Sequence, residues 1–120
     1  LRLMEQVLST LELHQEGQLA YIHVTREMVD KTGAAEGDTE GFINYPRSLQ
    51  SVKVALFLKE MKDGVISVSM RAKGECDVAE IAALFGGGGH RNAAGCRFSN
   101  ATLEQVRKQV LAELSNALVS

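Results

Sequence analysis

The sequence of 120 residues contains no tryptophan, one proline and two cysteines, and aromatic residues make up only 5% of it. Two cysteines are too few for a small domain held together by disulfides, and they suit a reducing, cytoplasmic environment. Thirteen Lys and Arg against fifteen Asp and Glu give a net charge of -2. The excess of positive charge that is typical of a non-specific duplex-DNA binder is therefore missing, although a local basic site remains compatible with this balance.

The chain also lacks a hydrophobic run of the roughly 18 residues that a membrane-spanning helix needs, and its start does not have the pattern of a signal peptide. Its content of 45% hydrophobic and 23% charged residues is ordinary for a soluble globular protein. The length fits one domain with one hydrophobic core. Because the chain begins with Leu1 and not with Met, we expect it to be part of a longer protein.

The hydrophobic pattern predicts a single compact α/β domain with a mixed β-sheet flanked by helices. Strands are expected over residues 18–24, 51–60, 65–72 and 96–98. Helices are expected over residues 1–15, from Thr25 to Gly33, from Asp77 to Gly86 and over residues 103–118. The 51–60 strand has apolar residues on both faces, so it is expected at the centre of the sheet. An Asp63-Gly64 turn is expected to join it to the next strand as a hairpin.

Four consecutive glycines, Gly86 to Gly89, precede His90 and exceed what folding requires, since one glycine is enough to end a helix. Ordering glycine costs more backbone entropy than ordering any other residue. Glycines let backbone N–H groups converge on an anion with no Cβ in the way. A helix beginning near Asn92 would add partial positive charge at its N-terminus. These residues favour a phosphate-binding loop between a helix and the following segment, and the alternative is a flexible surface loop.

Arg71 is a second candidate, because it lies on the polar face of the 65–72 strand, just before the helix that leads to the glycines. Its planar guanidinium suits bidentate binding of phosphate, whereas the alternative is an exposed arginine on a sheet face. His90 could donate a hydrogen bond to phosphate or act as an acid or base. We find no metal-ligand spacing, nucleophile elbow or P-loop motif. The sequence thus offers an anion-binding site without groups that activate water.

The segment GGGGHRNAAG, residues 86–95, resembles the signature loop of the DHH-associated domain, the C-terminal half of many DHH-family phosphoesterases. The stretches GFINYPRSLQSVKVALFLKE, SMRAKG and DVAEIAALF resemble the same family. They are most similar to its branch of nanoRNases and 3',5'-nucleotide-phosphate phosphatases, formerly called exopolyphosphatase-related. The resemblance implies that residues 1–16 are a connector helix to a missing N-terminal DHH domain and that residues 17–120 are the substrate-binding domain.

The resemblance also implies roles for particular residues. In such enzymes the N-terminal domain holds two manganese ions, and the associated domain closes over them and binds the substrate. Transferred by position, the residues that bind substrate phosphate are Arg71, Gly86, Gly87, Gly88, Gly89, His90 and Asn92. Lys73, Asn44 and Arg47 are further candidates.

This chain has no Asp-His-His motif and no set of metal-binding carboxylates, so the resemblance implies the substrate-binding half of a hydrolase, inactive without its catalytic domain. The expected substrate is a short oligonucleotide or a nucleotide 3',5'-bisphosphate, and the expected partner is the DHH domain of the same protein. Three alternatives remain open: a cyclic-dinucleotide phosphodiesterase, a nucleic-acid-binding module such as the C-terminal domain of alanyl-tRNA synthetase, and a lone regulatory nucleotide-binding domain. The oligomeric state is also left open, a homodimer included.

Overall fold

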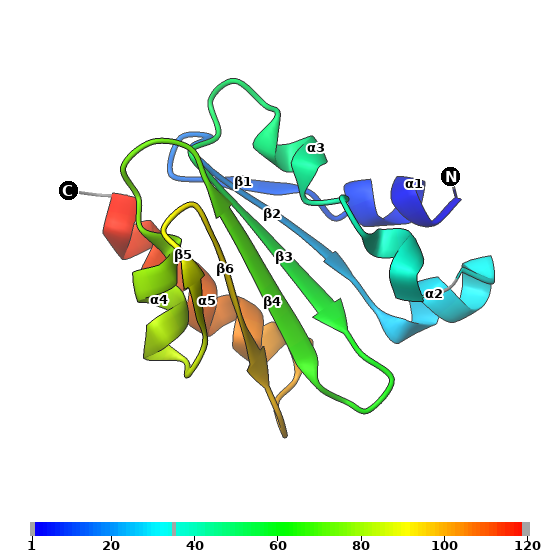
Figure 1. The fold of residues 1–120 in the computed structure, drawn as a ribbon. Helices are drawn as coiled ribbons and strands as arrows, with labels where there is room; N and C mark the ends of the chain where they lie inside the picture. The colour runs from blue at the N-terminus through cyan, green and yellow to red at the C-terminus, as the bar shows by residue number, and fades with distance from the viewer. Residues whose placement is uncertain (1, 35, 119–120) are drawn as a thin grey trace.

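The computed structural model describes residues 2–34 and 36–118, which build a six-stranded mixed sheet with helices on both faces (Figure 1). The strands are β1 Glu12–His14, β2 Leu19–Val24, β3 Val54–Glu60, β4 Ile66–Ala72, β5 Gly88–His90 and β6 Ala93–Phe98. Their order across the sheet is β1-β2-β3-β4-β6-β5. β2 and β3 pair in parallel, and the other neighbouring pairs are antiparallel. The α/β class expected from the sequence is confirmed, and so is the central position of the 51–60 strand.

The helices divide between the two faces of the sheet. They are α1 Arg2–Leu8, α2 Arg26–Thr32, α3 Asn44–Arg47, α4 Val78–Leu84 and α5 Leu103–Leu118, with a 3-10 turn, η1, at Glu36–Thr39. Figure 1 shows α4 and α5 against one face and α1, α2 and α3 on the other.

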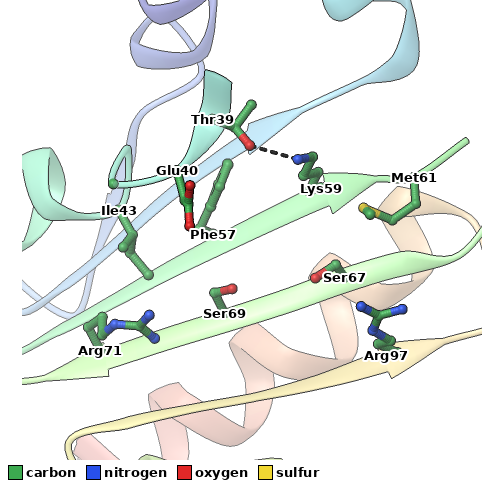
Figure 2. Close-up of a pocket in the computed structure, with 11 residues that line it drawn as sticks. Thr39, Glu40, Ile43, Phe57, Lys59, Met61, Ser67, Ser69, Arg71 and Arg97 are labelled. Atoms are coloured by element: carbon green, nitrogen blue, oxygen red, sulfur yellow. Dashed lines mark hydrogen bonds between the residues drawn. The ribbon is translucent and has the colours of Figure 1, made fainter. Parts of the chain in front are cut away.

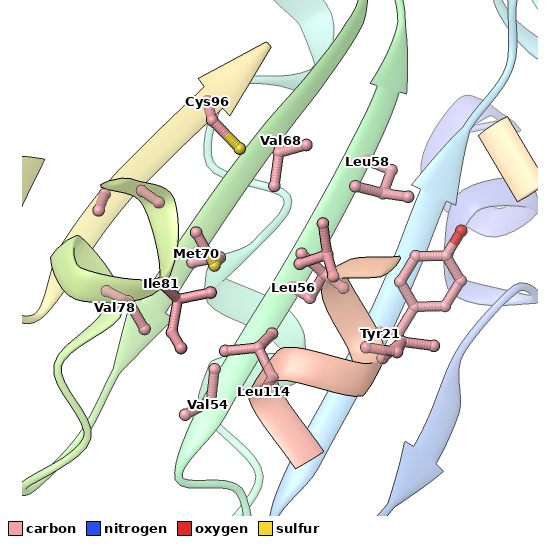
Figure 3. Packing of buried hydrophobic residues seen from close by; sticks show 14 of the residues in the cluster. Tyr21, Val54, Leu56, Leu58, Val68, Met70, Val78, Ile81, Cys96 and Leu114 are labelled. Carbon is pink, nitrogen blue, oxygen red and sulfur yellow. The ribbon is translucent and has the colours of Figure 1, made fainter. Parts of the chain in front are cut away.

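The larger core lies between the sheet and the pair α4 and α5 (Figure 3). Alternate residues of β3, including Leu56 and Leu58, point into it and are fully buried, as is Leu114 of α5. Val68 and Met70 of β4 follow the same alternation. Each Å² of apolar surface removed from water contributes roughly 25 cal/mol of favourable free energy. This burial is therefore the main force that holds α4 and α5 on the sheet.

The second core is smaller and covers only part of the opposite face. It joins Ile22 of β2 and Phe57 of β3 to Val7 of α1 and Val29 of α2. β4 and β6 contribute no residue to this cluster. The same face of β4 and β6 is therefore left without a helix over it in the described part of the chain, and this is where the candidate site lies.

The predicted helix boundaries are set by side-chain caps. The Met28 N–H donates to Thr25 Oγ1 at 3.1 Å, and Asp77 accepts from two backbone N–H groups at the start of α4. Thr102 and Gln105 cap α5 reciprocally, with distances of 2.9 and 3.1 Å. Each such cap contributes about 1 kcal/mol. With these caps, α2, α4 and α5 begin where the sequence predicted them.

The helix predicted over residues 1–15 is wrong beyond Leu8. Thr10 Oγ1 accepts a hydrogen bond from the backbone N–H of His23 at 2.9 Å, and residues 12–14 then pair with β2 as the edge strand β1. Gln15 and Glu16 have positive φ angles, which a helix does not allow. Residues 12–14 form a strand because the edge of β2 offers them backbone hydrogen-bond partners. The apolar pattern of residues 1–15 contains no sign of this pairing.

The expectation for residues 86–95 is also wrong in part. Gly88–His90 forms strand β5 rather than an irregular loop, and no helix begins near Asn92, because β6 starts at Ala93. β6 provides the partner that lets a glycine-rich segment become a strand. The partial positive charge expected from a helix N-terminus at Asn92 is therefore not part of the site.

Candidate phosphate-binding site

A groove crosses the uncovered part of the sheet (Figure 2). Its lining comes from β3, β4, β6 and the segments next to them: Thr39, Glu40, Gly41, Ile43, Phe57, Lys59, Met61, Ser67, Ser69, Arg71 and Arg97. Three of these side chains are cationic and one is a carboxylate. A chain with a net charge of -2 therefore gathers positive charge in one groove, which is the local basic site that its composition left open.

Arg71 and His90 lie in one row across the sheet. Arg71 of β4 pairs with Ala93 of β6, and Ala93 pairs in turn with His90 of β5. Residues directly opposite one another on neighbouring strands project to the same face. Two strand spacings place the Cα atoms of Arg71 and His90 roughly 10 Å apart. Both side chains are long enough to reach an anion held above the small side chain of Ala93.

The two side chains differ in how they are held. The Arg71 guanidinium donates from Nη1 to the backbone oxygen of Met70 at 2.9 Å, which leaves its other N–H groups available for an anion. His90 is exposed, and its ring makes no hydrogen bond to residues 2–34 or 36–118. A phosphate at this row would therefore meet one positioned donor group and one adaptable one.

The turn between β5 and β6 is fixed by three hydrogen bonds. The Ala72 N–H donates to the Asn92 oxygen at 2.8 Å, and the Val78 N–H donates to the Arg91 oxygen at 2.9 Å. The Arg91 side chain donates to the Glu75 oxygen at 2.9 Å. The backbone of Asn92 thus ties the hairpin to β4, whereas its side chain is exposed and outside the groove lining.

The four glycines are not equivalent. A Cβ on Gly87 would lie 2.2 Å from the Gly95 oxygen, and one on Gly89 would lie 2.6 Å from a backbone oxygen of β6. Gly86 has a φ angle of 81°, where a side chain is strained. Gly88 has no atom within 4 Å of its Cβ position and no positive φ. Packing and backbone conformation therefore explain three of the four glycines, whereas neither explains Gly88.

Of the residues predicted from the sequence, Arg71 lines the groove. The others are outside its lining: Gly86, Gly87, Gly88, Gly89, His90, Asn92, Lys73, Asn44 and Arg47. Lys73 donates from Nζ to the Leu49 oxygen at 3.0 Å, while Asn44 and Arg47 are exposed on α3. The structure adds Lys59 and Arg97, which the sequence did not single out. In the sequence, only the alternation of polar and apolar residues along the strands pointed to Lys59 and Arg97. The register with β4 shows which face of the sheet each of them occupies.

The described residues hold no group of three or more His, Cys, Asp or Glu side chains that could bind a metal ion. Among residues 2–34 and 36–118, none of the helices combines the length and apolar character that crossing a membrane requires.

The fold and the GGGGHRNAAG hairpin define the class: the chain belongs to the DHHA1 domain family, whose model matches residues 16–120. A bifunctional oligoribonuclease and PAP phosphatase NrnA of Thermus thermophilus is 36% identical over 110 residues, covering 92% of this chain and 32% of that protein. A 3',5'-cyclic-nucleotide phosphodiesterase of Helicobacter pylori is 42% identical over 67 residues, which is 48% of this chain and 19% of that protein.

Among solved structures, an exopolyphosphatase-related protein from Bacteroides fragilis superposes with a TM-score of 0.85 and 35% sequence identity. The match covers 99% of this chain and 36% of that one. The Thermus thermophilus and Bacteroides fragilis proteins both match most of this chain. The chain spans about a third of the length of each of these two relatives. The resemblance inferred from the sequence, including the nanoRNase branch, is confirmed.

Proposed function

We propose that this chain is the substrate-binding domain of a DHH-family phosphoesterase that acts on short oligonucleotides or nucleotide 3',5'-bisphosphates. The observation that carries the proposal is the row formed by Arg71, Ala93 and His90 on the uncovered sheet face. A phosphate above Ala93 would accept charge-assisted hydrogen bonds from Arg71 and a hydrogen bond from His90. Gly88 would let the ligand approach the backbone at the edge of the sheet.

In this proposal the chain positions the substrate and does not activate water. The hydrogen bonds that fix the hairpin tip keep the β5–β6 turn close to its bound geometry, which lowers the entropic cost of binding. Metal ions in a partner DHH domain would supply the nucleophile by lowering the pKa of bound water. The contribution of Arg71 and His90 is to hold the phosphate where that domain meets the open face of the sheet.

The names of the relatives support the substrate class. The Thermus thermophilus protein is named an oligoribonuclease and PAP phosphatase. Both parts of this name describe an enzyme whose substrate is a nucleotide or short oligonucleotide with few phosphates. A short groove with three cationic side chains suits such a ligand better than a long duplex, which needs an extended basic surface. The net charge of -2 is consistent with this short contact.

A double-mutant cycle tests the shared phosphate. Adenosine 5'-monophosphate is titrated into the chain and into Arg71→Ala, His90→Ala and the double variant, with binding followed by NMR. Each single variant should weaken binding roughly 10- to 150-fold, as expected for loss of a charge-assisted hydrogen bond. Because the two groups contact one phosphate, their effects should not be additive. Lys108→Ala, which removes an exposed positive charge from α5 on the opposite side of the sheet, is the control and should bind normally.

Two results would contradict the proposal. Wild-type affinity for His90→Ala and Arg71→Ala would remove both residues from the site. Strictly additive losses in folded variants would place the two residues in separate subsites.

A further inference from the structure

The groove contains a second cationic row, parallel to the row of Arg71. Lys59 of β3 pairs with Ser67 of β4, and Ser67 pairs with Arg97 of β6. All three line the groove, so their side chains share the face of Arg71. Figure 2 shows Lys59, Ser67 and Arg97 grouped at the end of the groove opposite Arg71.

A neutral row separates the two cationic rows. Phe57, Ser69 and Gly95 pair across the same three strands. Each step between rows is two residues along a strand, so the outer rows lie roughly 13 Å apart at their Cα atoms. Figure 2 shows the Arg71 side chain directed along the sheet toward Ser69, which shortens the gap between the cationic groups. The middle row offers a hydroxyl, a ring and a position with no side chain.

Arg97 is the member of the second row that is available to bind an anion. Arg97 is exposed and forms no hydrogen bond or ion pair within the described part of the chain. Arg97 also lines a second hollow, together with Gly86 and Gly87. Arg97 therefore borders both the groove and the first two glycines of the glycine-rich segment. Lys59 donates from Nζ to Thr39 Oγ1 at 2.8 Å, which holds its ammonium group over the groove.

One carboxylate, that of Glu40, faces the same groove. Figure 2 places Glu40 beside Ile43 and Phe57, on the α3 side of the groove and across the sheet from Arg97. Arg97 thus lies away from this carboxylate. An anionic ligand that reaches both ends of the groove meets positive charge at each and a neutral stretch between them.

We propose that Arg97, together with Lys59, binds a second phosphate of the substrate, one nucleoside away from the phosphate held by Arg71 and His90. This inference rests on the proposed function and deepens it, because it defines the substrate as a linear nucleotide with at least two phosphates that lies along β4. The ribose and base between the phosphates pack over Gly95 and against Phe57, and the hydroxyl of Ser69 donates to the ligand there.

The test compares a dinucleotide with a mononucleotide on the same chain. The linear 5'-phosphorylated dinucleotide pApA and adenosine 5'-monophosphate are each titrated into the wild type, Arg97→Gln and Arg71→Ala. The wild type should bind pApA about 10-fold more tightly than the mononucleotide. Arg97→Gln should abolish this preference and leave binding of the mononucleotide unchanged. Arg71→Ala should weaken binding of both ligands.

The salt dependence provides a second readout that a structural effect would not change. Loss of one phosphate contact should make binding of pApA by Arg97→Gln less dependent on salt concentration than binding by the wild type, with no change for the mononucleotide. Lys108→Ala is the matched control, because it removes one positive charge from α5, on the opposite side of the sheet.

The outcomes separate the two proposals. If Arg97→Gln binds pApA as tightly as the wild type while Arg71→Ala loses both ligands, the second subsite is wrong and the proposed function stands. If neither ligand binds the folded wild type, the proposed function is wrong, and the second subsite with it. A loss of mononucleotide binding in Arg97→Gln that equals its loss of pApA binding would place Arg97 at the first phosphate instead.

Discussion

At the scale of single residues, packing explains why residue 87 is glycine but gives no reason for the glycine at position 88. A side chain at position 87 collides with β6, whereas one at position 88 extends into open space. We therefore expect Gly88→Val to change the free energy of unfolding by less than about 1 kcal/mol, since a β-branched residue suits a strand, while phosphate binding is lost. The matched variant Gly87→Val should destabilise the fold by roughly 3 kcal/mol through overpacking.

Urea denaturation and titration with adenosine 5'-monophosphate measure the two effects separately. Outright unfolding of Gly88→Val would show that the fold also requires this glycine, and normal binding by a folded Gly88→Val would remove it from the site.

At the scale of elements, the short strand β1 is attached to α5 by one ion pair. Arg107 donates from Nε to Glu12 Oε2 at 3.2 Å and contacts the other carboxylate oxygen through Nη2. These hydrogen bonds hold the pKa of Glu12 below its ordinary value, although burial acts in the opposite direction. The pair therefore adds stability above the ordinary glutamate pKa of about 4.3, and this stability is lost as the pH falls through the lowered pKa.

Glu12→Gln should accordingly cost up to about 1 kcal/mol near neutral pH, a modest value because solvent screens the partly exposed pair. The difference from the wild type should disappear at acid pH, because the wild-type carboxylate is then protonated. Urea denaturation at a series of pH values measures both effects. A cost that stays constant from neutral to acid pH would mean that packing, and not charge, links β1 to α5.

The elements that the sequence predicted well are those whose signal is local. β3, β4 and α5 carry long periodic patterns or caps, so their positions follow from the residues alone. β1 and β5 have three residues each, and β5 contains two glycines, so nothing local indicates a strand. Both exist because a neighbouring strand offers backbone hydrogen bonds, which a sequence does not display.

The same distinction applies to the candidate site. Arg71 and His90 could be selected from their motifs, but their common row depends on the pairing of β6 with both β4 and β5. Arg97 lies on β6, of which the sequence predicted only residues 96–98. The sequence did not determine on which face of the sheet the Arg97 side chain lies. Register is therefore the information that brought these separate residues onto one face of the sheet.

At the scale of the whole molecule, the chain has a core on each side of the sheet but no gathered metal ligands among the residues that the structure describes. We expect the isolated chain to unfold cooperatively, with a midpoint that neither a chelator nor added Mn²⁺ shifts, since these cores need no metal. We also expect no hydrolysis of pApA by the isolated chain with Mn²⁺ present, because the described residues gather no ligands for the metal ions that would activate water in the proposed function. Thermal unfolding followed by circular dichroism and product analysis by chromatography measure the two properties. Non-cooperative unfolding would show that the fold depends on a partner domain. Metal-dependent hydrolysis that copurifies with the chain, and that Arg71→Ala abolishes, would show that the catalytic groups are already present here.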